Sequence, residues 1–336
     1  MKAQVYKIHS DFYYVKNNEG ETITCKMRDV LKKQKIDIRV GDFVCLSEDK
    51  NFISSLTERK NQLNRPKVSN IDCALVVCSL KEPDLDFIQL NRYLTYLKYN
   101  NIDVAICLNK EDLVDDLNDK KTQISSIYEK LGYKIFFISA KNKTDLDELL
   151  EFIKDKTIVL CGMSGVGKST LLNSLNADVF FRTGEVSSKT QRGCHTTRHC
   201  EIVDCSGFRI IDTPGFSCLK FDFLLPDELI NYFEDIKQFA SECKFADCLH
   251  NEHNNSMCGV VSNLDKIEKT RYDSYLMFLN ETIEYKELIS KRSIKDEAKN
   301  KNVGNRVSVK ISKRKRESSR NTHRQKIKDF EINENE

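Results

Sequence analysis

The sequence predicts a multidomain α/β protein. Short runs rich in β-branched and aromatic residues fill residues 1–64 and favour a small β-barrel. Residues 65–222 alternate apolar strands with amphipathic helices around a glycine-rich loop, which is typical of a doubly wound, mostly parallel sheet. Residues 223–290 combine helical periodicity with clustered cysteines and histidines, and residues 291–336 are a basic tail. We therefore expect three folded domains and one extension.

Composition indicates a soluble chain without a membrane partner. Its 336 residues suffice for two or three domains, and 40% are hydrophobic while 31% are charged. The first residues, MKAQVYKIHSDF, lack the apolar stretch of a signal peptide, and the apolar run Cys73 to Leu80 is too short to cross a bilayer. We expect a cytoplasmic monomer. In that reducing compartment the 13 cysteines do not predict a disulfide framework.

Charge is divided unevenly along the chain. From Lys291 to Lys328 there are 15 Lys and Arg against three acids, whereas the net charge of the whole chain is only +3, so the rest is acidic. A basic extension points to a polyanionic partner, because clustered cations displace counterions from phosphates. The tail has too few apolar residues to fold alone. It either orders on contact with RNA or only solubilises the chain.

The N-terminal runs predict a five-stranded OB-fold barrel that binds RNA. QVYKI, FYYVKN, TITCKM and FVCLSE read as short strands, and turn signals separate them. Exposed aromatic side chains on such a barrel can stack on bases. Phe12, Tyr13 and Tyr14 are candidates, although each could instead belong to the core. A linker follows at Arg65-Pro66.

From Ile71 the pattern changes to strands and helices in alternation. Four apolar runs predict parallel strands, and three periodic segments between them predict helices. The strands are Cys73 to Cys78, Val104 to Leu108, Lys134 to Ser139 and Ile158 to Cys161, and the helices are Phe87 to Lys98, Gln123 to Leu131 and Leu146 to Ile153. Later, His199 to Asp204 and Arg209 to Asp212 predict the two arms of a hairpin.

The chain is centred on a phosphate-binding loop, GMSGVGKST, directly after the fourth strand. The pattern G-x-x-x-x-G-K-[ST] surrounds a polyphosphate with backbone N–H groups, which glycine allows to come close. Its lysine reaches the β- and γ-phosphates, and its serine hydroxyl binds Mg²⁺. A helix then begins, and its positive end faces the phosphates. The predicted nucleotide-binding residues of this P-loop are Gly162, Met163, Ser164, Gly165, Val166, Gly167, Lys168, Ser169 and Thr170.

Two further loops predict recognition of guanine. NKED, residues 109–112, fits N-K-x-D after the second strand, and SAK, residues 139–141, follows the third. In GTPases such an aspartate accepts two hydrogen bonds from the guanine base, a donor pair that adenine lacks. Asp112 would therefore select GTP over ATP, while the Ala140 N–H could reach the guanine O6. The predicted base-binding residues are Asn109, Lys110, Asp112, Ser139, Ala140 and Lys141.

Two later segments predict the remaining contacts to magnesium and the γ-phosphate. GCHTTRH contains Thr196 and Thr197, of which one would bind Mg²⁺ beside Ser169; the sequence does not distinguish them. IIDTPG ends a strand with D-x-x-G, which puts Asp212 near Mg²⁺ and the Gly215 N–H at the γ-phosphate.

Phe216 stands where Ras-like GTPases place a water-orienting glutamine. A phenyl ring cannot orient water by hydrogen bonding, so another group must do so. His195 is the candidate, because its imidazole can orient the attacking water; alternatively it is an ordinary polar loop residue. Lys168 and Gly215 complete the predicted catalytic set.

The order of these motifs is unusual. Ras-like GTPases begin with the phosphate loop, whereas here N-K-x-D and S-A-K precede it. Such a rotation is tolerated where chain ends lie close together. We therefore predict a circularly permuted P-loop GTPase. Because D-x-x-G leads straight into the C-terminal region, loss of the γ-phosphate could pull on the domain after Phe216.

The C-terminal region predicts a helical, zinc-binding domain. Helices are expected over Asp227 to Ala240 and from near Ile267. Between them, C-x4-C-x-H-x7-C offers three thiolates and one imidazole, the ligand set of a closed structural Zn²⁺ site. His253 is a rival for the imidazole ligand. The predicted ligands are Cys243, Cys248, His250 and Cys258.

The combination resembles the RsgA (YjeQ) family of circularly permuted GTPases. The motifs that carry the resemblance are N-K-x-D before G-x-x-x-x-G-K-S, G-x-H-T-T, D-T-P-G-F and the cysteine cluster, within roughly residues 1–290. The resemblance implies an N-terminal OB-fold, a central GTPase and a third domain that holds one zinc ion. It also implies GTP hydrolysis to GDP, stimulated by the small ribosomal subunit during late maturation.

Partners and residue roles follow from the same resemblance. The implied partners are GTP and GDP with Mg²⁺, the 30S subunit and its 16S rRNA. His195 looks like the catalytic histidine of the family, and Phe216 like its hydrophobic replacement for glutamine. The zinc spacing departs from the family pattern, because seven residues rather than the usual five separate His250 from Cys258. The choice between His250 and His253 therefore stays open.

Overall fold

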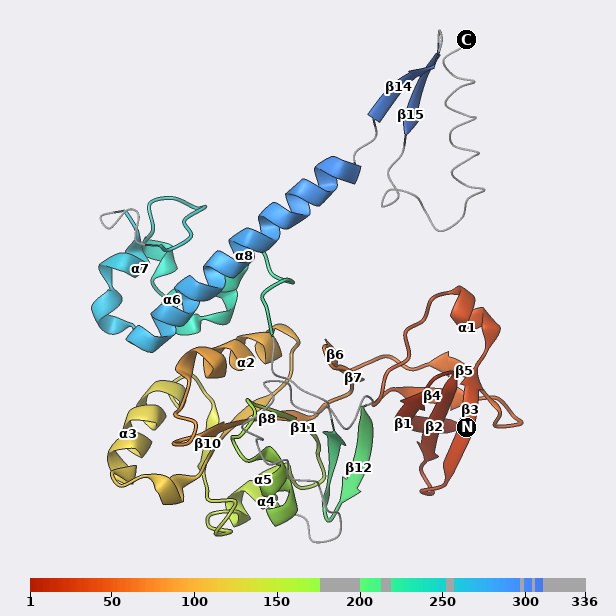
Figure 1. Cartoon of the computed structure of the whole chain (residues 1–336), viewed down its shortest axis with the longest axis horizontal. Coiled ribbons are helices and arrows are strands. Elements are labelled where there is room, and N and C mark those ends of the chain that lie inside the picture. Colours follow the sequence, from red (N-terminus) through yellow and green to blue (C-terminus); the bar gives the residue numbers. More distant parts are fainter. Residues whose placement is uncertain (176–199, 213–218, 252–256, 297–298, 304–305, 311–336) are drawn as a thin grey trace, which may run out of the picture. The chain divides into compact units, whose positions relative to one another are not determined.

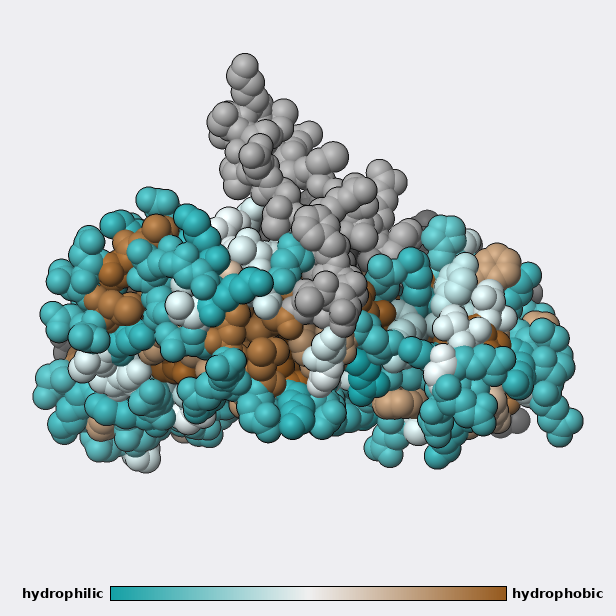
Figure 2. Space-filling model, turned by 90° about the horizontal axis from the view of Figure 1, so that it is seen from below, coloured by the Kyte–Doolittle hydropathy of each residue, from teal (hydrophilic) through white to brown (hydrophobic). Residues whose placement is uncertain are grey.

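The structure is a computed structural model that describes residues 1–175, 200–212, 219–251, 257–296, 299–303 and 306–310 (Figure 1). The chain divides into two compact units, one made of Met1–Lys220 with Ile230–Met277, the other of Phe221–Leu229 with Phe278–Glu336. Of the helices in the described part, none combines the length and apolar character that crossing a membrane requires. Hydrophilic side chains cover most of the face that Figure 2 shows.

Five strands close into a barrel at the N-terminus. They pair in the order β1-β2-β3-β5-β4, and β4 pairs back onto β1, which confirms the predicted five-stranded, OB-like barrel. The apolar side chains of alternate positions fill its interior, and Val5, Val15 and Val44 are fully buried. The elements are β1 (Lys2–His9), β2 (Phe12–Asn17), β3 (Thr22–Met27), α1 (Asp29–Lys33), β4 (Phe43–Leu46) and β5 (Phe52–Leu56).

Alternation along β2 decides between the two interpretations of its aromatic residues. Tyr13 points inward and is only 8% exposed, so it belongs to the core. Phe12 is 41% exposed, and the ammonium of Lys26 lies 4.9 Å from its ring centroid. Of these two, Phe12 is therefore the one available for stacking.

The central sheet has the predicted doubly wound form. Its order is β10-β9-β8-β11-β13-β12, and every pair is parallel except β12 with β13. All seven residues of β8 are buried, as expected for a strand covered on both faces. The strands are β8 (Cys73–Ser79), β9 (Val104–Asn109), β10 (Lys134–Phe137), β11 (Thr157–Cys161), β12 (Glu201–Cys205) and β13 (Phe208–Asp212), preceded by the linker hairpin β6 (Gln62–Asn64) and β7 (Lys67–Ser69).

Helices cover both faces of this sheet, with α2 on one side and α4 and α5 on the other (Figure 1). Leu149 of α4 and Leu171 of α5 belong to one apolar cluster with Leu75 and Leu160 of the sheet. Leu90 and Leu94, on α2, are buried but lie outside that cluster. The helices are α2 (Phe87–Tyr99), η1 (Glu111–Leu113), α3 (Leu117–Tyr128), α4 (Asp147–Ile153) and α5 (Lys168–Leu175).

The β12–β13 hairpin joins the central sheet to the barrel. Lys7 of β1 pairs with Glu201 of β12, so the barrel and the central strands share one eleven-stranded sheet. The Lys7 ammonium also lies 2.5 Å from the Glu201 carboxylate, and the Lys16 ammonium lies 2.7 Å from Asp204. The hairpin that the sequence predicts is thus also the seam between the two folds.

The helix predicted over Asp227 to Ala240 is wrong, because this segment forms three short pieces. Leu229, Phe233 and Ile236 are buried, but Phe233 leaves the helical conformation with φ −124° and ψ 75°. Its ring packs edge-on against Tyr275, with centroids 5.4 Å apart, so tertiary packing outweighs local periodicity. The pieces are η2 (Leu229–Tyr232), α6 (Glu234–Lys237) and η3 (Ala240–Glu242), followed by α7 (Gly259–Ser262) and η5 (Leu264–Lys266).

The C-terminal end has more secondary structure than the sequence predicts. Helix α8 (Lys269–Asp296) begins near the expected position but continues past Lys291. Strands β14 (Lys299–Val303) and β15 (Arg306–Lys310) then pair antiparallel. Residues 311–336, the remainder of the predicted tail, lie outside the described residues.

A buried polar network holds α2 and α3 to α6 and the first turns of α8. The side chain of Asn91 donates to Ser274 at 2.9 Å and accepts from Tyr128 at 3.1 Å and Arg271 at 2.9 Å. The Arg271 guanidinium makes two further bonds of 2.9 Å to the Asp235 carboxylate. Since Arg271 is only 3% exposed, its charge is stabilised mainly by this paired geometry.

We predict that Asp235→Asn lowers the free energy of unfolding by roughly 3 kcal/mol, because it leaves the buried Arg271 charge without its partner. Urea denaturation followed by circular dichroism measures the loss. The neighbouring pair Lys98–Glu234 is exposed, so Glu234→Gln is the matched control and should change stability by no more than about 0.5 kcal/mol. If the two substitutions lowered the free energy of unfolding equally, burial of the ion pair would not determine its contribution to stability.

Candidate functional site

The P-loop lies at the carboxyl end of β11, in the middle of the central sheet, and leads into α5. Two of its glycines are required by close packing. A Cβ on Gly162 would lie 2.2 Å from the Val77 carbonyl oxygen, and one on Gly167 would lie 2.4 Å from the Asn109 side-chain nitrogen. Gly167 also has φ +93°, which side chains rarely adopt. The loop is therefore pressed against the neighbouring strands β8 and β9.

Lys168 bends back over this loop. Its ammonium donates to the carbonyl oxygens of Gly162 at 2.9 Å and Met163 at 2.7 Å. Burial lowers the pKa of the Lys168 ammonium, and an anion beside it would oppose that shift. Leu171 and Leu175 anchor α5 in the core, so its N-terminus stays directed at the loop. The arrangement suits a phosphate group.

Asn109 joins the three motifs that the sequence separates. Its Nδ2 donates to the carbonyl oxygen of Val166, in the P-loop, at 2.9 Å. Its Oδ1 accepts from the backbone N–H of Ala140, in S-A-K, at 2.9 Å, and from that of Lys110 at 2.8 Å. The two loops predicted to recognise guanine, residues 109–112 and 139–141 (the base-reading loops), therefore fold directly beside the phosphate loop, although they are encoded before it.

The other base-reading residues surround this junction. Asp112 is exposed at the surface, and its Oδ1 accepts from the Ser139 hydroxyl at 2.6 Å. Lys110 adopts a left-handed backbone conformation with φ 64°, and its ammonium donates to the Glu82 carbonyl oxygen. The Ala140 N–H already donates to Asn109, so a contact with guanine O6 would have to share this hydrogen. The sequence contains no signal for the backbone contact to Glu82.

The remaining predicted residues differ in exposure. Val166 is buried, Ser169 is half-buried in the first turn of α5, and Asp212 ends β13, which pairs with β11. Exposed positions are Met163, Ser164, Gly165, Thr170 and Lys141. The predicted residues His195, Thr196, Thr197, Gly215 and His253 lie outside the described residues.

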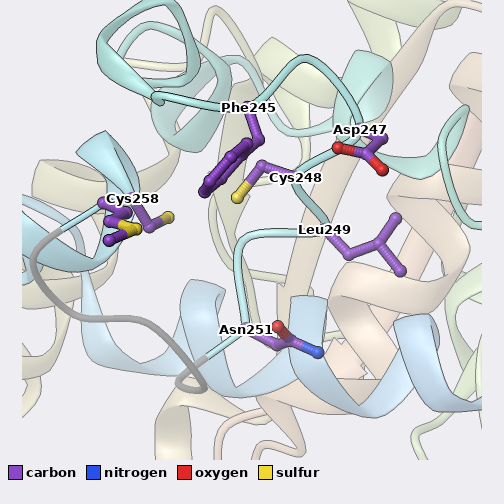
Figure 3. A pocket seen from close by; sticks show the side chains of 7 residues that line it. Phe245, Asp247, Cys248, Leu249, Asn251 and Cys258 are labelled. Carbon is purple, nitrogen blue, oxygen red and sulfur yellow. The ribbon is translucent and has the colours of Figure 1, made fainter.

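The structure brings the four predicted metal ligands together. The ligand atoms of Cys243, Cys248, His250 and Cys258 all lie within 4.8 Å of one another. His250 Nδ1 is 3.3 Å from the Cys243 sulfur and 3.8 Å from the Cys258 sulfur. Figure 3 shows Cys248 and Cys258 among the residues that line a pocket beside this cluster. This cluster could hold a metal ion.

The distance between two of the sulfurs fits tetrahedral coordination by a small cation. Ligand bonds of about 2.3 Å in a tetrahedron put two sulfurs about 3.8 Å apart. The sulfurs of Cys243 and Cys258 are 3.9 Å apart. Burial lowers the pKa of His250, which favours the neutral imidazole that binds metals.

Two tyrosines of α8 support the segment that carries His250, one of the candidate metal ligands, in a way that the sequence does not reveal. The Tyr272 hydroxyl donates to the His250 carbonyl oxygen, and the Tyr275 hydroxyl donates to that of Leu249, each at 3.0 Å. His250 has φ 56°, so these bonds fix an uncommon backbone conformation. The helical spacing of the two tyrosines predicts only an apolar face.

We predict that Gly167→Ala abolishes measurable nucleotide binding, because the new Cβ would displace the Asn109 amide from the P-loop. Titration with a fluorescent guanosine diphosphate measures the loss of affinity. Gly132→Ala is the matched control, since Gly132 also has a left-handed φ, +84°, but nothing lies within 4 Å of an added Cβ. The control should cost about 1–2 kcal/mol of stability and leave affinity unchanged. Normal binding by Gly167→Ala would contradict the role given to this contact.

Known families match most of the chain. Residues 56–222 match the family described as RsgA GTPase, and residues 2–53 match the RsgA N-terminal domain. Residues 157–302 also match a family described as 50S ribosome-binding GTPase. The first two matches cover the central sheet and the barrel.

Two relatives of known name agree with these family matches. The small ribosomal subunit biogenesis GTPase RsgA of Clostridium botulinum (strain Loch Maree / Type A3) is 40% identical over 287 residues, which cover 84% of this chain and 97% of the relative. The protein of the same name from Alkaliphilus metalliredigens (strain QYMF) is 42% identical over 289 residues, 83% of this chain and 97% of the relative.

Two crystal structures are similar along most of their length. YjeQ from Thermotoga maritima is 30% identical with a TM-score of 0.71, covering 84% of this chain and 98% of that structure. YloQ, a circularly permuted GTPase, is 33% identical with a TM-score of 0.69, covering 84% and 95%. The chain therefore belongs to the RsgA family, and its centre is a circularly permuted GTPase domain.

Proposed function

We propose that this protein hydrolyses GTP to GDP and phosphate on the small ribosomal subunit and assists late maturation of that subunit. The observation that carries the nucleotide assignment is the side chain of Asn109, which bonds the P-loop at Val166 and the base-reading loop at Ala140. Because Asn109 bonds both loops, a bound base and its phosphates would lie side by side at this edge of the sheet. Asp112, held by Ser139, would then select guanine.

In this proposal Lys168 exchanges its two carbonyl partners for the β- and γ-phosphates. Mg²⁺, when bound with GTP, would neutralise charge that develops on the phosphates. Ser169 and Asp212 are the described residues that would hold it, because Ser169 lies in the first turn of α5, just after β11, and Asp212 ends β13, the strand paired with β11. Thr196 or Thr197 would add a ligand. His195 would orient the attacking water, and the Gly215 N–H would contact the γ-phosphate.

The partner is proposed from the relatives and from the barrel. Relatives that cover most of this chain are named small ribosomal subunit biogenesis GTPases. The exposed Phe12 ring with Lys26 beside it suits stacking on a base of 16S rRNA. A basic tail would add contacts to phosphates. We propose that the protein acts as a monomer in the cytoplasm, where ribosomal subunits mature.

We predict slow GTP turnover by the protein alone and an acceleration of roughly tenfold or more by purified small subunits. Release of phosphate under single-turnover conditions measures both rates. His195→Ala should lower the stimulated rate by about 100-fold while GTP affinity is kept, and His199→Ala is the control in the same segment. Equal turnover with and without small subunits would refute the proposal.

Two rivals predict different results in the same assay. The match of residues 157–302 to a 50S ribosome-binding GTPase family favours a large-subunit factor, which large subunits would stimulate and retain in co-sedimentation. An RNA-binding scaffold that holds nucleotide only as a structural ligand would show no hydrolysis dependent on either subunit. The RsgA N-terminal match over residues 2–53 favours the small subunit.

We further propose that Cys243, Cys248, His250 and Cys258 hold one structural Zn²⁺ ion. His250 is preferred to His253 because its Nδ1 lies within 3.8 Å of two of the sulfurs. A closed set of four protein ligands would stabilise the fold of this loop-rich segment and leave no position for a substrate.

We predict one zinc ion per purified chain, measured by elemental analysis against protein concentration. His250→Ala should reduce the zinc content well below one per chain, because three thiolates cannot close the tetrahedron. His253→Ala tests the rival ligand and should retain the metal. If His253→Ala lost the zinc and His250→Ala retained it, the fourth ligand would be His253.

A further inference from the structure

Glu111 occupies the variable position of N-K-x-D, yet it is buried. It begins the short helix η1, and only 8% of the residue is exposed. A carboxylate is rarely buried unless it is paired, and nothing in nucleotide chemistry asks for an acid at this position. The burial of this charge therefore calls for a structural partner.

Two partners meet the Glu111 carboxylate. Its Oε1 accepts from the Thr144 hydroxyl at 3.1 Å, and its Oε2 lies 3.0 Å from the ammonium of Lys121, on α3. Lys121 is itself two-thirds buried, so the pair is shielded from water. The ion pair with Lys121 balances the charge of the carboxylate. The bond from Thr144 then links Glu111 to the loop that contains S-A-K.

Thr144 closes the loop that contains S-A-K. Its backbone N–H donates to the Ser139 carbonyl oxygen at 3.1 Å, and the Ser139 N–H donates back to Thr144 at 3.4 Å. Ala140 lies between these two closing residues. The loop of residues 139–144 thus has two fixed ends and an exposed middle.

Three side chains at the end of β9 and just after it hold this loop at three points. Asn109 accepts from the Ala140 N–H, Asp112 accepts from the Ser139 hydroxyl, and Glu111 accepts from the Thr144 hydroxyl. The first two belong to the recognised base-reading motif. Glu111 supplies the third point, at the far end of the loop.

We propose that Glu111 and Thr144 are positioning residues that set the affinity for guanine by fixing the loop of residues 139–144 against the base. This inference rests on the proposed guanine-nucleotide site. The loop offers backbone N–H groups to the base oxygen O6, and fixing its far end before binding removes an ordering cost from association. The phosphates do not touch this loop in the proposal, so phosphate binding should not depend on the Glu111–Thr144 bond.

The test is Thr144→Val, which removes the hydroxyl but keeps the shape of an exposed side chain. We expect the affinity for guanosine diphosphate to fall about tenfold, as for loss of a hydrogen bond to a charged group. Inosine diphosphate shares O6 and should lose the same factor, while the weak affinity for adenosine diphosphate should not change. For GTP turnover, KM should rise and kcat should not.

Thr122→Val is the matched control. Thr122 is exposed on α3, and its hydroxyl bonds only the helix, at the Asn118 carbonyl oxygen 2.9 Å away. All three affinities should match those of the unmodified protein. The double variant Glu111→Ala with Thr144→Val should weaken guanine binding no more than Glu111→Ala alone, because Thr144 acts through its bond to Glu111.

Failure of this inference is distinct from failure of the proposed function. If the unmodified protein does not prefer guanosine over adenosine diphosphate, the proposed nucleotide site is wrong. If it does, but Thr144→Val keeps the full preference, the Glu111–Thr144 bond is only structural and the inference is overturned. Equal losses for the guanosine and adenosine nucleotides would likewise overturn it, because they would reflect damage to the whole pocket.

Discussion

The nucleotide site depends on one amide side chain. Asn109 satisfies a P-loop carbonyl with its nitrogen and two backbone N–H groups with its oxygen, and it is only 2% exposed. Because the amide is buried, moving any one loop would leave a polar group without a partner, at a cost of about 1–3 kcal/mol. The absence of a side chain on Gly167 makes room for this contact. The phosphate loop and the base-reading loops are therefore fixed together before any nucleotide binds.

This junction explains why a rearranged motif order preserves the site. The strands that carry the base-reading loops, β9 and β10, lie on one side of β8, and β11 with its P-loop lies on the other. All four are parallel, so their carboxyl ends meet at one edge of the sheet. Contact between the loops depends on strand order in space, which does not depend on the order in which the chain supplies the strands.

Much of this architecture could be predicted from the sequence, because it depends on local patterns. Continuous apolar runs such as β8 predict the sheet, and the spacing of the cysteines predicts that Cys243, Cys248, His250 and Cys258 come together. The sequence carries no signal for the break at Phe233, because the break arises from packing on Tyr275, far along the chain. The hairpin of β14 and β15 was missed because its high charge outweighed the alternating valines of RVSVK. The sequence does not predict the burial of Glu111, because this burial follows only from the folded loops. Domain boundaries after residues 64, 222 and 290 stay predictions.

The seam between β1 and β12 has a mechanical consequence. One residue pair, Lys7 with Glu201, carries the strand pairing, and the charged contacts around it are partly exposed. Dissolved ions weaken such contacts, whereas the strand ladders within the barrel and among the central strands are hardly affected. A force that bends the barrel away from the central strands would therefore separate β1 from β12 before it separates other strand pairs. The hairpin could then transmit tension into β13, the strand that ends at Asp212.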